Sequence, residues 1–148
     1  MELFYIYPES LPNSHARSTT VVKSVASLQE FYNLTLCAKK ESLSGEEIGK
    51  IYDVSLDKAK LRFLSGDFWG LRSHLFFNER LRRVLPAKAV IFVRHLKTAE
   101  FLLKNRRDGW KIVFESHEIF YKTTLKPKLA AKLERMERFV YQNTDAIV

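Results

Sequence analysis

The sequence has a single cysteine, Cys37, and no long apolar run. One cysteine excludes an internal disulfide and a multi-cysteine zinc site, and it suits a reducing, cytoplasmic compartment. No stretch approaches the roughly 18 consecutive apolar residues of a membrane-spanning helix. Five glycines and four prolines in 148 residues exclude collagen-like and low-complexity chains. With 46% hydrophobic and 28% charged residues, the composition predicts one globular domain.

Charge is divided unevenly along the chain. Residues 1–79 carry nine Lys and Arg against ten Asp and Glu, a net of −1, whereas residues 80–148 carry sixteen against seven, a net of +9, which together make +8. A basic half favours a polyanionic partner, such as a phosphorylated small molecule, nucleic acid or anionic lipid headgroups. Ordinary solvated surface charge explains the same pattern equally well.

Short apolar runs alternate with helical spacings of apolar residues, which predicts an α/β fold with a doubly wound, mostly parallel sheet. The segment 42–66 is ambiguous, because it combines a helical start with two runs, 51–54 and 61–64, that each suit a short strand. The expected strands are 2–7, 34–38, 89–93, 111–115 and 146–148, and the expected helices are about 16–31, 68–85, 96–103 and 129–140.

Polar residues that follow the expected strands should meet at one edge, because ligands bind beyond the carboxyl ends of parallel strands. Three of the four histidines fall there, the exception being His74. The loops after the first strand, the 89–93 strand and the 111–115 strand supply Asn13, Ser14, His15 and Arg17, then Arg94 and His95, then Ser116, His117, Glu118 and Lys122. We predict that a phosphate or an acceptor substrate is held by Asn13, Ser14, His15, Arg94, His95, Glu118 and Lys122.

Structural explanations compete with this interpretation. Ser14 suits an N-cap of the first helix as well as a ligand contact. His117 could simply be satisfied by the neighbouring Glu118. The spacing of His117, Glu118 and the other histidines matches no established metal motif, and the first loop lacks the glycine-rich dinucleotide fingerprint.

The expected last helix is strongly basic and could lie on an anionic lipid surface. Glu134 and Arg138 are spaced as an i, i+4 pair, so part of its charge pattern is ordinary helix stabilisation. Its basic residues and the one that precedes it are Lys126, Lys128, Lys132, Arg135 and Arg138.

The order of these parts resembles the N-terminal domain of retaining glycosyltransferases of family 4, which consist of two Rossmann-like domains (the GT-B architecture). The resemblance covers nearly the whole chain and is closest in its last third. It lies in the opening strand and helix, the strand end Ile91-Phe92-Val93-Arg94-His95, the run Lys111-Ile112-Val113-Phe114-Glu115-Ser116-His117-Glu118, the helix around Leu133-Glu134-Arg135-Met136-Glu137 and the closing Thr144-Asp145-Ala146-Ile147-Val148.

The resemblance implies an enzyme that transfers a sugar from a nucleotide-sugar donor to a glycan or lipid-linked acceptor, without an obligatory metal or other cofactor. His117 would be the catalytic residue that contacts the transferred sugar, and Lys122 would match a position that binds an acceptor phosphate in some members. The loop of Asn13, Ser14 and His15 would match the one that approaches the donor diphosphate, although family members usually carry glycines there.

Residues 1–148 would then be a single N-terminal domain, inactive alone, because the family's C-terminal domain holds most donor contacts. We expect a cytoplasmic protein, peripheral at the inner face of the membrane. One alternative is a stand-alone flavodoxin-like module that binds nucleotide or protein without catalysis. A nucleic-acid-binding domain is disfavoured, because the sequence has no stacking-platform or recognition-helix signature.

Overall fold

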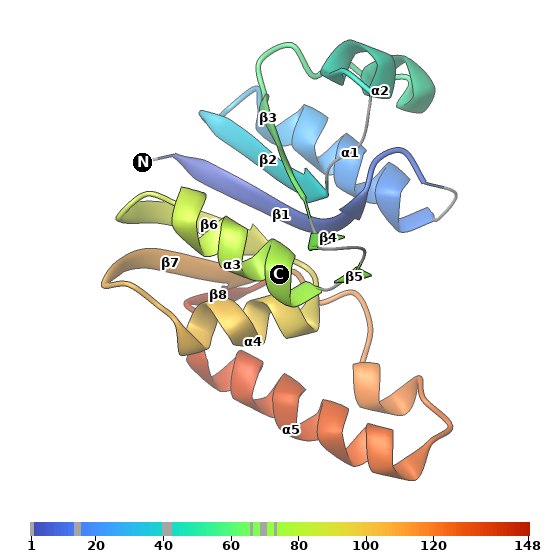
Figure 1. The fold of residues 1–148 in the computed structure, drawn as a ribbon, viewed down its shortest axis with the longest axis vertical. Helices are drawn as coiled ribbons and strands as arrows, with labels where there is room; N and C mark the ends of the chain where they lie inside the picture. The colour runs from blue at the N-terminus through green and yellow to red at the C-terminus, as the bar shows by residue number, and fades with distance from the viewer. Residues whose placement is uncertain (1, 14–15, 40–42, 66, 69–70, 73) are drawn as a thin grey trace.

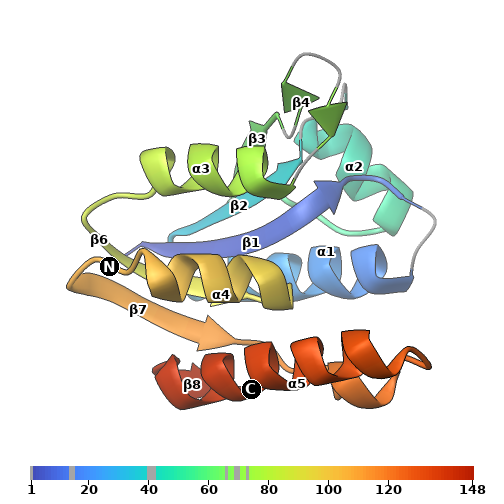
Figure 2. The same ribbon diagram turned by 60° about the horizontal axis from the view of Figure 1, so that its bottom comes forward.

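The computed structural model of the chain describes residues 2–13, 16–39, 43–65, 67–68, 71–72 and 74–148. Six parallel strands form one twisted sheet with helices on both faces (Figures 1 and 2). The sheet strands are β1 (Leu3–Ser10), β2 (Leu34–Lys39), β3 (Lys60–Leu64), β6 (Lys88–Val93), β7 (Gly109–Phe114) and β8 (Ala146–Ile147). The helices are α1 (Ala16–Leu28), α2 (Gly45–Tyr52), α3 (His74–Val84), α4 (Leu96–Lys104), the 3₁₀ helix η1 (Phe120–Lys122) and α5 (Pro127–Asn143).

The strand order β3-β2-β1-β6-β7-β8 confirms the doubly wound, Rossmann-like fold. Each pair in the sheet is parallel, from β2 with β3 at one end to β7 with β8 at the other. The order reverses between β1 and β6: β2 and β3 follow β1 toward one edge of the sheet, and β7 and β8 follow β6 toward the other. A flavodoxin-like sheet has the different order 2-1-3-4-5.

The sheet is buried on both faces, as is usual for parallel strands. Alternate residues of β1 point to opposite cores: Phe4 and Ile6 pack with α3, α4 and α5, whereas Tyr5 and Tyr7 pack with α1 and α2. This alternation explains why a continuous apolar run predicted the strand correctly.

One expected element was wrong, and the ambiguous segment 42–66 is resolved as a helix, α2, followed by a strand, β3. The helix expected from residue 68 begins only at His74, since Asp67–Phe68 (β4) pairs antiparallel with Leu71–Arg72 (β5). Phe68 and Leu71 are partners across that hairpin, and a spacing of three residues is shared by a hairpin and a helix. Residues 51–54 form no strand, because α2 continues to Tyr52 and Asp53 caps it in the left-handed conformation at φ 52°.

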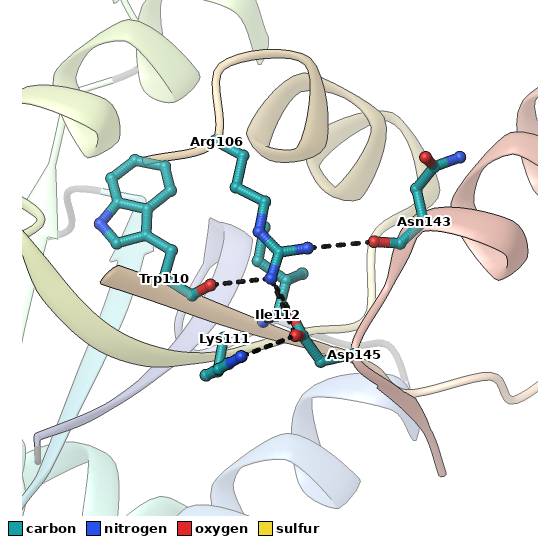
Figure 3. A network of polar contacts seen from close by, with 6 residues as sticks. All are labelled: Arg106, Trp110, Lys111, Ile112, Asn143 and Asp145. Carbon is teal, nitrogen blue, oxygen red and sulfur yellow. Dashed lines mark hydrogen bonds and ion pairs between the residues drawn. The ribbon is translucent and has the colours of Figure 1, made fainter. Parts of the chain in front are cut away.

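A polar network fastens the entry to β8 onto β7 (Figure 3). Arg106, in the loop before β7, donates through Nη2 to both carboxylate oxygens of Asp145, at 2.8 and 2.6 Å. Asp145 Oδ2 also accepts from the Ile112 N–H at 2.8 Å. Arg106 Nη1 donates to Asn143 O at 3.2 Å, which ties down the end of α5. The network acts on structure, because it lies away from the carboxyl end of β7.

Candidate functional site

The carboxyl ends of β1, β6 and β7 are neighbours in the sheet, and the candidate site is built on them. The reversal of strand order between β1 and β6 is the point at which doubly wound sheets bind ligands. Arg94 follows β6, and Glu115, His117 and Glu118 follow β7. Three predicted residues, Arg94, His117 and Glu118, are therefore brought close enough to interact electrostatically.

Glu115 connects the three strand ends. Its Oε2 accepts a hydrogen bond from Tyr5 Oη on β1, and its Oε1 lies 3.5 Å from Arg94 Nη1. Its backbone N–H donates to Val93 O on β6 at 3.0 Å. Burial, and then the bond to Glu115, raise the pKa of the Tyr5 phenol, so the phenol stays protonated and donates. The Glu115 carboxylate thus holds Arg94 at the point where the strand order reverses.

The Arg94 guanidinium is nearly enclosed, with its side chain only 11% exposed. Among the described residues, its Nε and Nη1 have no hydrogen-bond partner of good geometry, and Nη1 keeps only the longer contact with Glu115. Burying a guanidinium with unused donors is unfavourable. This guanidinium is therefore suited to an anionic or hydroxyl-bearing ligand.

His117 lies in the same cluster, with its side chain 18% exposed. Its Nε2 is 3.3 Å from Glu118 Oε1, but neither ring nitrogen has a well-aligned hydrogen bond within the described part of the chain. The ring edge packs on Phe120 at 5.4 Å between centroids. Burial, and then the positive charge of Arg94, lower the pKa of His117. A neutral imidazole can both donate to and accept from a substrate hydroxyl.

The start of α1 closes the cluster from the β1 side. Arg17 Nη2 is 3.1 Å from Glu118 Oε1, and the Arg17 side chain is 52% exposed. Glu118 is thus shared between Arg17 and His117. The exposed guanidinium adds a positive group at the solvent side of the cluster.

His95 lies at the same edge but makes different contacts. Its Nδ1 is 3.1 Å from Thr98 Oγ1, and its ring stacks on His74 at 4.9 Å. Burial, and then the nearby His74, lower the pKa of His95 to about 4. The stacking corrects the sequence analysis, which placed His74 away from this edge: the start of α3 brings it there.

Asn13 organises the loop after β1. Its Nδ2 donates to Tyr7 Oη at 3.0 Å and to Ser10 O at 2.8 Å, and its N–H donates to Tyr52 Oη at 3.2 Å. These bonds engage the amide within the protein, so the structure gives Asn13 a role in shaping the loop. The predicted contacts of Ser14 and His15 lie outside the described residues.

Lys122 is not part of this cluster. It ends η1, is exposed, and its Nζ lies 5.9 Å from the ring centroid of Tyr121. In the part of the chain that the structure describes, no ion pair joins Lys122 to the cluster's carboxylates, Glu115 and Glu118. The binding of an acceptor phosphate by Lys122 stays a prediction, and its position would be outside the cluster.

A second set of hydroxyl contacts supports the end of β7. Ser116 Oγ is 2.7 Å from Tyr141 Oη, which donates to Glu137 Oε1 at 2.9 Å. Glu137 is 3% exposed, although it lies on the basic helix α5. The Ser116 N–H donates to Val148 O at 2.8 Å. These contacts position the backbone immediately before His117.

Sequence reasoning missed Tyr5, Glu115 and His74 as members of the site. Tyr5 belongs to an apolar strand, where a tyrosine suggests core packing. Glu115 was part of the run 111–118, but no role was predicted for it. A signal was available for Glu115: it directly follows the apolar run Ile112-Val113-Phe114 of an expected buried strand, where a carboxylate requires a partner.

Within the described ranges, His, Cys, Asp and Glu side chains nowhere gather in threes in the way that metal binding requires. The cluster holds two arginines, two glutamates and a histidine, and the unused donors of the enclosed Arg94 suit phosphate, carboxylate or sugar hydroxyl groups. No protein-family model matches the chain, and no curated protein matches it.

Proposed function

We propose that this chain is the acceptor-side domain of a retaining glycosyltransferase, which moves a sugar from a nucleotide-sugar donor to a glycan or lipid-linked acceptor. One observation carries the proposal. At the carboxyl end of β7, the His117 ring, whose nitrogens make no well-aligned hydrogen bond among the described residues, lies beside the enclosed guanidinium of Arg94. The resemblance in sequence assigns the reacting sugar to that same strand end.

Each side chain then has a chemical role. His117 hydrogen-bonds a hydroxyl of the transferred sugar, and its pKa, lowered by burial, keeps it neutral for that purpose. Arg94, held by Glu115, offers buried donors to an anionic group, and Arg17 adds a second charge from the solvent side. Water is kept from the His117 ring on the side where Phe120 packs.

The stand-alone binding module remains the alternative function. Its flavodoxin-like form is disfavoured by the observed strand order, β3-β2-β1-β6-β7-β8. Its prediction is that the cluster binds a nucleotide, while no nucleotide sugar is consumed in the presence of any acceptor.

A peripheral position at the inner face of the cytoplasmic membrane is the second part of the proposal. Among the described helices, none combines the length and the apolar character needed to cross a bilayer. The basic half of the sequence favours attachment to anionic headgroups instead. Lipid-linked acceptors would be presented at such a surface.

The experiment is a transfer assay with a panel of nucleotide sugars and with glycan and lipid-linked acceptors. It uses the native polypeptide, by which we mean the protein isolated from its natural source, because residues 1–148 are expected to be inactive alone. Release of nucleoside diphosphate that depends on an acceptor, with retention of the donor's anomeric configuration in the product, supports the proposal. Nucleotide binding without acceptor-dependent release would instead favour the binding module.

A further inference from the structure

A lysine-rich lobe of the surface is formed by residues 119–133, which comprise η1, the turn after it and the first half of α5. This lobe contains four lysines and no acidic residue. In Figures 1 and 2, η1 and the start of α5 lie at the lower right end of the molecule, past the carboxyl end of β7. The lobe begins two residues after His117. It is therefore at the same end of the molecule as the candidate site.

Large apolar side chains are exposed on the same lobe. Leu125 is 100% exposed, Ile119 46% and Leu129 41%. A single exposed leucine is common on protein surfaces. Three such residues among four lysines within one short stretch form the combination that lets a segment lie in a membrane interface, with the apolar groups below the headgroups and the lysines among them.

The positive charge of the lobe is not neutralised by the protein. Among the described residues, none of the four lysines forms an ion pair with a carboxylate. The two acidic residues that flank the lobe are engaged elsewhere: Glu118 with Arg17 at 3.1 Å, and Glu134 with Arg138 at 3.1 Å. The four lysines are Lys122, Lys126, Lys128 and Lys132.

We propose that the 119–133 lobe docks on an anionic lipid bilayer, with Leu125 and Leu129 entering the interface and the lysines contacting lipid phosphates. This docking surface rests on the proposed function, and it is the part of the protein that would attach to the membrane. It assigns Lys122 a lipid headgroup in place of a bound acceptor phosphate. Docking here would hold the His117 cluster close to an acceptor embedded in the membrane.

A lipid surface accounts for the lobe better than nucleic acid does. Lysines alone would suit either polyanion. A phosphate backbone offers no apolar surface to the fully exposed Leu125, whereas burial of this side chain in a membrane interface is favourable. Substitution of Leu125 therefore distinguishes a lipid surface from nucleic acid in an experiment.

The test is sedimentation of the purified protein with phosphatidylcholine vesicles, with or without phosphatidylglycerol. We expect binding only to the anionic vesicles, and weakening as salt is added. The double variant Lys126→Glu/Lys128→Glu should reduce binding at least about tenfold, because it replaces attraction to the headgroups with repulsion, and Leu125→Ser should reduce it about tenfold, because the serine has no apolar surface to bury.

Matched controls are exposed residues outside the 119–133 lobe. Lys23→Glu/Lys88→Glu makes the same change in net charge at two exposed lysines outside the lobe. Phe31→Ser removes another apolar side chain, which is 80% exposed beyond α1. Both controls should bind anionic vesicles like the wild type. Because Leu125 and the lysines are exposed, thermal unfolding of all variants should match the wild type.

Three results would overturn the docking surface: equal binding to neutral and anionic vesicles, lobe variants that bind like the wild type, or control variants that lose binding as the lobe variants do. Binding of duplex DNA that is unaffected by Leu125→Ser, without vesicle binding, would assign the lobe to nucleic acid instead. The assay involves no sugar transfer. Vesicle binding without transferase activity therefore refutes the proposed function alone, and transfer to a soluble acceptor without vesicle binding refutes the docking surface alone.

Discussion

Arg17 Nη2 lies 3.1 Å from Glu118 Oε1, although the two residues are 101 positions apart in the chain. The contact joins the first turn of α1 to the loop after β7, across the point where the strand order reverses. Glu118 is also 3.3 Å from His117 Nε2. The pKa of His117, which burial lowers most, is therefore also shifted by charges on α1 and in the loops after β6 and β7.

Substitution of these charges should move the pKa of His117 in opposite directions. Arg94→Gln removes a positive charge and should raise the pKa, whereas Glu118→Gln removes a negative charge and should lower it further. NMR titration of the His117 ring resonances measures both shifts. Lys88→Gln, far from the cluster on β6, should leave the titration unchanged. Equal curves for Arg94→Gln and Glu118→Gln would contradict the arrangement of charges described here.

His95 should make the fold sensitive to mild acid. Its pKa is about 4 in the folded protein against an ordinary 6.5, so the unfolded chain binds the proton more readily. Stability is therefore complete above about pH 6.5 and falls as the pH drops toward 4, by up to about 3 kcal/mol. Urea unfolding at about pH 7 and about pH 4.5 should show a smaller decrease for His95→Asn than for the wild type. The same decrease in both proteins would show that His95 is not responsible.

Asp145→Asn should weaken the attachment of β8. Burial by itself would raise the pKa of Asp145, but the Ile112 N–H and Arg106 hold it below its ordinary value. Removal of the charge should lower the free energy of unfolding by about 1–2 kcal/mol near neutral pH. Because the pKa is lowered in the folded state, the difference persists above the ordinary pKa of Asp and disappears as pH falls through the lowered value. Urea denaturation measures this.

The control for Asp145→Asn is Asp108→Asn, in the exposed turn before β7. It should change stability by less than about 0.5 kcal/mol. A loss of equal size in both variants would mean that the network in Figure 3 contributes nothing specific.

The parallel sheet was predictable because its evidence is local. The run 89–93 is apolar throughout, as in a strand buried on both faces, and the histidines at 95 and 117 follow strand ends directly. The hairpin at β4 and β5 was not, because Phe68 and Leu71 have a spacing that also suits a helix. A spacing pattern cannot separate these two structures without the tertiary contacts.

The candidate site was predictable only in outline. Strand ends indicate which residues reach the edge, and Arg94, His117 and Glu118 do meet there. Contacts such as Arg17 with Glu118, or Tyr5 with Glu115, join residues more than 100 positions apart in the chain. Sequence spacing carries no record of them, because they depend on the parallel pairing of β6 with β1 on one side and with β7 on the other.

The central claim is that His117 acts on the transferred sugar, and turnover of the native polypeptide in the transfer assay tests it most directly. His117→Ala should lower turnover by about 100-fold or more while the thermal unfolding transition is retained, and Lys88→Ala should leave turnover unchanged. Turnover of His117→Ala within about twofold of the wild type would contradict the account.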